Sequence, residues 1–145
     1  MWRVALVLLS ILLLAGCGSG AESEWSGPPR AQADGSIAVE SFNQYLRDYE
    51  DYSTSPEALA AEFLRLDDRR GATTSLVTSD GAEGAGDRAT AVATLEGVPD
   101  DSVESVRYVL VVTKEKDGWR LESAVRTQRC RGGRGHTDFS AAACV

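Results

Sequence analysis

Three cysteines and one histidine are the side chains of this sequence that offer the most chemistry. They are Cys17, Cys130, Cys144 and His136. A thiolate acts as a nucleophile, a metal ligand or half of a disulfide, and an imidazole binds metals or moves protons. Which of these chemistries is open to each residue depends on the segment that carries it.

Cys17 follows an apolar segment near the N-terminus. Val4 to Leu14 is apolar except for one serine, which is too short for a bilayer that needs about 20 residues and typical of a signal peptide. The residues Leu14-Ala15-Gly16-Cys17 resemble a bacterial lipobox. The resemblance implies a lipoprotein signal peptide over residues 1–16, cleavage before Cys17 and transfer of a diacylglyceryl group to its sulfur.

The lipobox also predicts a location. A chain held by at least two acyl chains is anchored firmly, here on the extracytoplasmic face of the cell membrane. Removing Arg3 with the signal leaves 14 basic and 22 acidic residues, a net charge of −8, and an acidic chain repels nucleic acid. Arginine outnumbers lysine 13 to 2, a bias that resembles proteins of high-GC actinobacteria. We therefore expect an envelope protein with the membrane as a partner and no nucleic-acid partner.

With Cys17 lipidated, Cys130 and Cys144 remain as an even pair in an oxidising compartment, where a disulfide is expected. The bond would staple residues 130–145 as a C-terminal loop and contribute roughly 3 kcal/mol by constraining the unfolded chain. Two free thiols are the alternative. A metal held by this pair and His136 is not predicted, because a structural zinc ion takes four ligands with close paired spacings.

Arginines gather around this loop in a chain that is otherwise acidic. One interpretation is a site for a carboxylate, a phosphate or an anionic lipid headgroup, and the other is pairing with the acidic helices. The candidate anion-binding residues are Arg126, Arg129, Arg131, Arg134 and His136. No nucleophile-elbow motif is present, and we predict no catalytic residue. We also predict no bound metal and no cofactor.

The segment before the domain has no apolar periodicity. Gly18 to Gly35 is rich in small residues and contains Pro28-Pro29, a composition typical of linkers. Residues 17–35 are therefore predicted to be the lipidated cysteine and a flexible linker, and residues 36–145 a single domain. Three roles stay open for Trp25: docking on the domain, entering the membrane surface, or simple exposure.

Two helices are predicted at the start of the domain. Apolar residues three and four apart indicate one over Ile37–Glu50, with Ser36 as its N-cap. The second begins at Ser55-Pro56, because serine caps helices and proline favours their first position. Gly71 is the expected C-cap of this second helix.

The periodicity then changes to that of strands. Strands are predicted at Thr73–Thr78, Arg88–Glu96 and Ser105–Lys114, and after the Asp117-Gly118 turn. Short connections imply an antiparallel meander of four strands, and Ser105–Lys114 is apolar on both faces, as a central strand is. Two sets of residues are expected to share a face of their strand: Ala89, Ala91, Ala93 and Leu95, and Trp119, Leu121 and Val125.

The predicted fold class is thus α+β, with two N-terminal helices packed on a four-stranded antiparallel meander and a disulfide-stapled C-terminal loop. This order, with the turn Asp117-Gly118-Trp119-Arg120-Leu121, resembles the nuclear-transport-factor-2-like and cystatin-like families. The resemblance implies a helix across a curved sheet, often beside a cone-shaped cavity. The tail from Gln128 to Val145 resembles small actinobacterial envelope lipoproteins, which implies an exported, disulfide-bonded domain.

Enzymes of the nuclear-transport-factor-2-like class typically place an Asp–His pair, or a Tyr or Asp, inside the cavity. Here the single histidine, His136, lies outside the predicted strands, among the arginines. We therefore expect a binding or interaction module of the cell envelope, with an envelope protein or a small ligand as partner, rather than an enzyme. The alternatives are a small-molecule enzyme of that class and a structural accessory subunit of an envelope complex.

Overall fold

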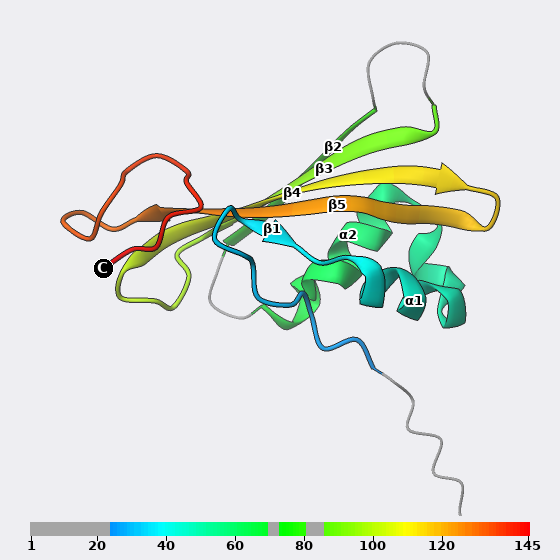
Figure 1. The fold of residues 1–145 in the computed structure, drawn as a ribbon, viewed down its shortest axis with the longest axis horizontal. Helices are drawn as coiled ribbons and strands as arrows, with labels where there is room; N and C mark the ends of the chain where they lie inside the picture. The colour runs from blue at the N-terminus through cyan, green and yellow to red at the C-terminus, as the bar shows by residue number, and fades with distance from the viewer. Residues whose placement is uncertain (1–23, 70–72, 81–85) are drawn as a thin grey trace, which may run out of the picture.

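The structure is a computed structural model that describes residues 24–69, 73–80 and 86–145. The predicted signal peptide and Cys17 lie outside these residues. An antiparallel sheet of five strands, in the order β1-β5-β4-β3-β2, carries two helices on one face (Figure 1). The α+β class is confirmed, with one strand more than predicted. No helix in the described ranges is long and apolar enough to cross a membrane.

Four of the strands form the predicted meander. They are β2 (Thr73–Asp80), β3 (Arg88–Glu96), β4 (Val103–Glu115) and β5 (Gly118–Cys130). Each pairs antiparallel with the next along the chain, and β4 occupies the centre of the sheet. The extra strand, β1 (Ser36–Ile37), pairs with the edge of β5. Two residues are too few to show a periodicity, so this strand could not be predicted from the pattern.

Helix α1 spans Glu40–Asp48, which is shorter than the predicted Ile37–Glu50. Ser36 does not cap it, because Ser36 belongs to β1 and its hydroxyl donates to Asp34 Oδ1 at 2.7 Å. The Glu40 carboxylate instead accepts the Val39 N–H at 3.1 Å. Pairing with β5 therefore removes the first turn of the expected helix, and a short 3-10 turn, η1 (Glu50–Ser53), follows it.

Helix α2 (Pro56–Leu64) begins as predicted, with Ser55 Oγ accepting the Ala58 N–H at 3.1 Å. The helix ends before the predicted C-cap Gly71, which lies outside the described residues. The helix stops where Arg65 adopts a left-handed conformation, φ 52°, and a 3-10 turn, η2 (Leu66–Asp68), follows. This early end leaves the far part of the sheet without helical cover, and the candidate site lies there.

The core lies between the helices and the inner face of the sheet. The predicted alternation of β3 is confirmed, because its inward side chains are buried and its outward ones are not. These inward residues are Ala89, Ala91, Ala93 and Leu95. The three alanines are small, so α2 packs closely on β3, and Leu59 and Phe63 of α2 are fully buried.

The prediction that Trp119, Leu121 and Val125 share one face of β5 is wrong beyond Leu121. Val111 pairs with Ser123 and Val112 with Leu121, so Glu122 is an extra residue in β5. Such a β-bulge moves every later side chain to the other face. Ala124 is consequently buried, whereas Val125 is exposed.

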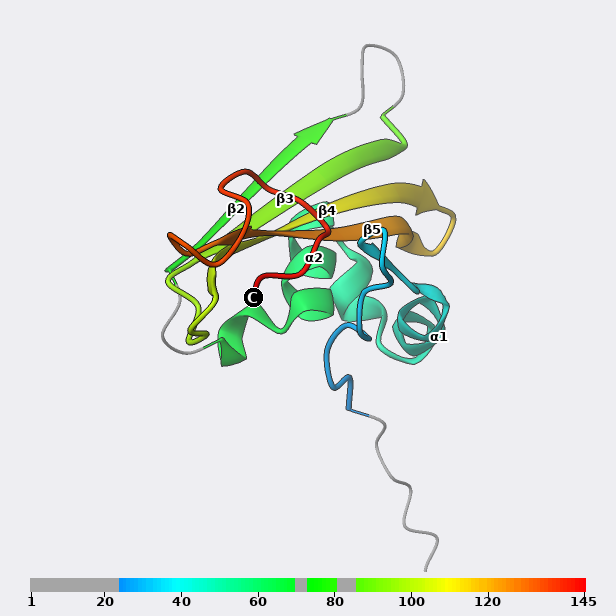
Figure 2. The same ribbon diagram turned by 60° about the vertical axis from the view of Figure 1, so that its left-hand side comes forward.

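The expected linker is also wrong from Glu24 onward. Residues 24–35, here called the strap, pack against the domain on the same side of the sheet as the helices (Figures 1 and 2). Trp25 is buried, and its indole N–H donates to the Phe63 carbonyl at 2.9 Å. Its ring lies 4.9 Å from that of Phe42. Of the three roles left open for Trp25, docking on the domain is the one observed.

Candidate functional site

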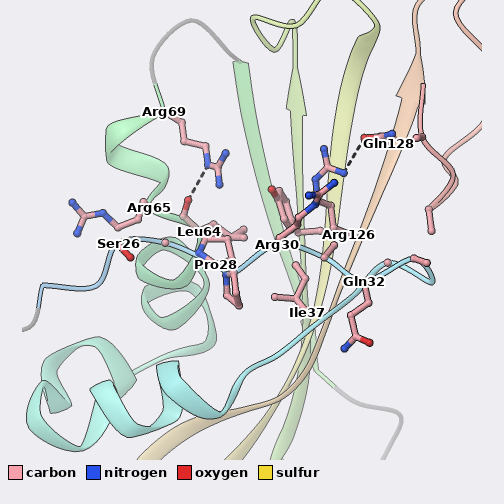
Figure 3. A pocket seen from close by; sticks show the side chains of 18 of the residues that line it. Ser26, Pro28, Arg30, Gln32, Ile37, Leu64, Arg65, Arg69, Arg126 and Gln128 are labelled. Carbon is pink, nitrogen blue, oxygen red and sulfur yellow. Dashed lines mark hydrogen bonds between the residues drawn. The ribbon is translucent and has the colours of Figure 1, made fainter. Parts of the chain in front are cut away.

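A cavity of about 1010 Å³ lies at the end of the sheet that α2 does not cover. Its walls are the strap, the residues after α2, the inner face of β4 and β5, and the C-terminal tail (Figure 3). Ligand sites commonly occupy about 300–1,000 Å³, so the size suits a small molecule. Five arginine and polar side chains give this arginine cavity its character: Arg30, Arg69, Tyr108, Arg126 and Gln128.

Arg69 is positioned by the end of α2. Its Nε donates to the Leu64 carbonyl at 2.8 Å, one of the carbonyls that a helix end leaves without a partner. Its guanidinium carbon lies 5.6 Å from the centroid of the Tyr108 ring on β4. The left-handed turn at Arg65 thus directs Arg69 back over the sheet.

Arg126 is positioned by β5. It pairs across the ladder with Tyr108, and its Nη1 donates to Gln128 Oε1 at 2.8 Å. Figure 3 shows Arg69 on one side of the cavity, Arg126 on the other and Arg30 on the strap between them. Three segments far apart in the chain therefore bring their guanidinium groups to one concave surface.

The cavity carries an excess of positive charge. Arg65 also lines it, but Arg65 is neutralised by Asp68 at 2.8 Å and by Glu24 at 3.3 Å. Within the described ranges, Arg30, Arg69 and Arg126 form no ion pair. The whole chain has a formal charge of −7, so these three positive charges are gathered in a protein that is negative overall. Unpaired cations around a concave surface raise the local concentration of anions.

The structure does not bring the five predicted anion-binding residues together. Only Arg126 lines the arginine cavity. Arg129 lies on the outer face of the sheet, where it pairs with Glu96 at 3.3 Å and Glu104 at 3.0 Å. Its acidic partners lie on the sheet rather than on the helices. Arg131 braces the turn between β3 and β4 by donating to the Asp100 carbonyl at 2.9 Å.

The remaining two predicted residues lie in the tail. Arg134 is exposed, and His136 lies with Nδ1 2.8 Å from the Asp138 carbonyl and Nε2 3.0 Å from the Ala142 carbonyl. Since carbonyls only accept, both bonds form together when both ring nitrogens carry a proton. The Ala142 and Asp138 carbonyls raise the pKa of His136 above its ordinary value. His136 is thus suited to bracing the tail rather than to acting as a base.

Cys130 and Cys144 hold the tail against the sheet. Their Sγ atoms lie 2.07 Å apart, so the predicted pairing is confirmed as a pair at bonding distance. The side chain of His136 lies close to both sulfurs, but sulfurs joined to each other are not thiolate ligands. Gln128 adds a second attachment, because its Nε2 donates to the Ala142 carbonyl at 2.9 Å. Residues 141–143 in turn form a wall of the arginine cavity.

The pattern of the sequence did not reveal Arg30 and Arg69. Arg30 lies in the segment assigned to the linker, and Arg69 follows two aspartates that suggest a solvated surface. The one available signal was the scarcity of lysine beside abundant arginine, which does not single out positions. Comparisons of the chain with protein families, with curated proteins and with solved structures gave no match.

Proposed function

We propose that this protein is a binding module that takes an anionic small molecule in the arginine cavity. The observation that carries the proposal is the presence of Arg30, Arg69 and Arg126 around it without ion-pair partners in the described ranges. Arg69 makes its hydrogen bond through Nε, which leaves its Nη groups for a ligand. Paired guanidinium N–H groups match the geometry of carboxylate and phosphate oxygens.

We also propose that the protein is an exported lipoprotein, with a signal peptide over residues 1–16 and a lipid anchor on Cys17. The lipobox supports this location, and so does the Cys130–Cys144 pair at bonding distance, because disulfides persist in oxidising compartments. The nuclear-transport-factor-2-like or cystatin-like relationship is part of the same proposal. It is supported by helices on one face of an antiparallel sheet with a cavity at one end. We propose no catalytic activity.

A second candidate function, an accessory subunit of an envelope complex, is favoured by the outer face of the sheet. The ladder places four valines side by side across four strands: Val77, Val92, Val109 and Val125. Val77 is 64% exposed and Val125 36% exposed. An exposed apolar row of this kind suits contact with another protein. Photocrosslinking from Val77 in cells, with an exposed polar position such as Gln44 as a control, tests this role.

The anion site predicts a selective effect of Arg126→Gln. Loss of a hydrogen bond to a charged group costs about 1.5–3 kcal/mol, so binding should weaken about 10- to 100-fold. Titration calorimetry of the full-length protein with inorganic phosphate and with butanoate measures this loss. Added salt should weaken binding to the unsubstituted protein as well, because the attraction is electrostatic.

Arg134→Gln is the matched control, since Arg134 is an exposed arginine of the C-terminal tail that does not line the cavity. It should leave both affinities unchanged. Equal losses in Arg126→Gln and Arg134→Gln would place the anion on the tail and contradict the proposed site.

The lipid anchor predicts that Cys17→Ala abolishes modification, because the thiol is the group that receives the lipid. Metabolic labelling with radioactive palmitate should show no incorporation, and the uncut precursor should accumulate. Cys144→Ala is the matched control, because it removes a cysteine outside the lipobox and should keep full labelling. Unchanged labelling of Cys17→Ala would refute the lipoprotein assignment.

A further inference from the structure

We infer that the anion carries a single alkyl chain, and that this chain enters an apolar cavity which adjoins the arginine cavity. The inference rests on the proposed anion-binding function and names the chemical class of its ligand. It follows from a second cavity, from the residues that line both cavities, and from the length of chain between the arginine cavity and the proposed lipid anchor.

The second cavity has a volume of about 400 Å³ and lies beside the turn between β3 and β4. Five of its ten lining residues are apolar, and we call it the apolar cavity: Leu95, Val98, Pro99, Val103 and Val106. The other five are Asp68, Arg69, Asp100, Tyr108 and Arg126, and the Asp100 carboxylate is engaged by the N–H groups of Ser102 and Val103. It exists because α2 ends at Leu64, before it reaches this end of the sheet. Apolar surface gains free energy when it leaves water, so this cavity favours an alkyl group.

The two cavities share Asp68, Arg69, Tyr108 and Arg126 as lining residues. The Asp68 carboxylate is paired with Arg65, so the cations left without an ion-pair partner at the boundary are Arg69 and Arg126, beside the Tyr108 ring. A ligand with its oxyanion between Arg69 and Arg126 has a direct route for its chain into the apolar cavity. A strongly hydrated anion without a chain would leave that cavity unfilled.

The sheet shows how far the chain has to reach. Tyr108 and Val106 lie two residues apart on the same face of β4, which corresponds to about 7 Å. Leu95 pairs directly with Val106 on the neighbouring strand. A chain of several methylenes that starts at the Arg126 side of Tyr108 thus reaches Val106 and Leu95.

The membrane is the source of amphiphiles that this geometry favours. Ser26 of the strap lines the arginine cavity and lies nine residues after Cys17. Nine fully extended residues span at most about 32 Å. With the proposed lipid on Cys17, Ser26 at the edge of the cavity stays within that distance of the bilayer surface, where single-chain amphiphiles collect.

A homologous series of alkyl carboxylates tests the inference. Titration calorimetry of the full-length protein with butanoate, hexanoate and octanoate, all below their micelle concentrations, should show affinity rising about fourfold per methylene, the factor for burial of one methylene. Octanol, which has the chain without the charge, should bind at least about tenfold more weakly than octanoate. Comparing the affinity of octyl phosphate with that of octanoate shows whether the site prefers a phosphate or a carboxylate head group.

Val98→Ser should flatten the dependence on chain length, because Val98 lines only the apolar cavity. Val111→Ser is the matched control, since Val111 is a half-buried valine on the outer face of β4. It should keep the full dependence. The series on the unsubstituted protein stands even if Val98→Ser fails to fold.

The outcomes separate the inference from the proposed function. If octanoate binds no tighter than butanoate while Arg126→Gln weakens both, the anion site stands and the alkyl-chain inference is overturned. If affinity rises with chain length but ignores Arg126→Gln, the head does not lie between the arginines, and both proposals fail. Absence of binding by every probe, octyl phosphate included, also overturns both.

Discussion

Replacing Trp25 with alanine is expected to lower the free energy of unfolding by about 3–5 kcal/mol, the range for truncation of a buried aromatic residue. The indole is buried among aromatic rings, with Phe42 at 4.9 Å and Phe63 at 5.9 Å between centroids. Its N–H donates to the Phe63 carbonyl. Alanine removes the rings' contacts, leaves a cavity and leaves that carbonyl without a partner.

The loss is measured by urea unfolding of the full-length protein, followed by far-ultraviolet circular dichroism. Trp25→Phe keeps most of the ring contact and removes the hydrogen bond. The loss of that bond alone should lower the free energy of unfolding by about 1 kcal/mol. Trp119→Ala is a control at a tryptophan that is only half-buried, and its cost should be smaller. An unfolding free energy of Trp25→Ala close to that of the unsubstituted protein would show that docking of the strap contributes little.

The second large effect is expected from Cys144→Ala. Losing the cross-link to Cys130 frees the tail in the unfolded chain and should cost about 3 kcal/mol of stability. Because residues 141–143 line the arginine cavity, anion binding should weaken as the tail loosens. The tail keeps other attachments, since Gln128 exchanges two backbone hydrogen bonds with Ser140 and donates from Nε2 to the Ala142 carbonyl. The sheet itself should therefore stay folded.

Urea unfolding and hydrogen exchange of residues 131–145 measure the two consequences. Reduction with dithiothreitol is the control, because it should destabilise the unsubstituted protein by the same amount and leave Cys144→Ala unaffected. No response of the unsubstituted protein to dithiothreitol would contradict a stabilising disulfide in the purified protein.

Much of the fold was predictable wherever the local pattern and the tertiary structure agree. The bounds of β3 were predicted to the residue, because Ala89 to Leu95 alternate between a buried and a less buried face. The start of α2 was predictable because Ser55 and Pro56 act within one turn. The cysteine pair was predictable because two cysteines remained after Cys17 was assigned to the lipid.

Elements that depend on distant partners were missed. Strand β1 exists because Ser36 and Ile37 pair with Val125 and Ala124, and the strap is ordered because Trp25 finds a place between α1 and α2. The β-bulge at Glu122 leaves the local sequence pattern unchanged, yet it places Val125 on the opposite face from Leu121, with which it was predicted to share a face. In each case the stabilising contact lies far away in the chain.

The sequence by itself determined the α+β class, the cysteine pair and, as a proposal, the lipid anchor on Cys17, since these depend on local periodicity and short motifs. Only the tertiary structure decided which arginines meet. It separated Arg129 and Arg131 from Arg126 and brought Arg30 and Arg69 to it. The physical reason is that a cavity is made by segments remote in sequence, and a charge is free for a ligand only where folding places no carboxylate beside it.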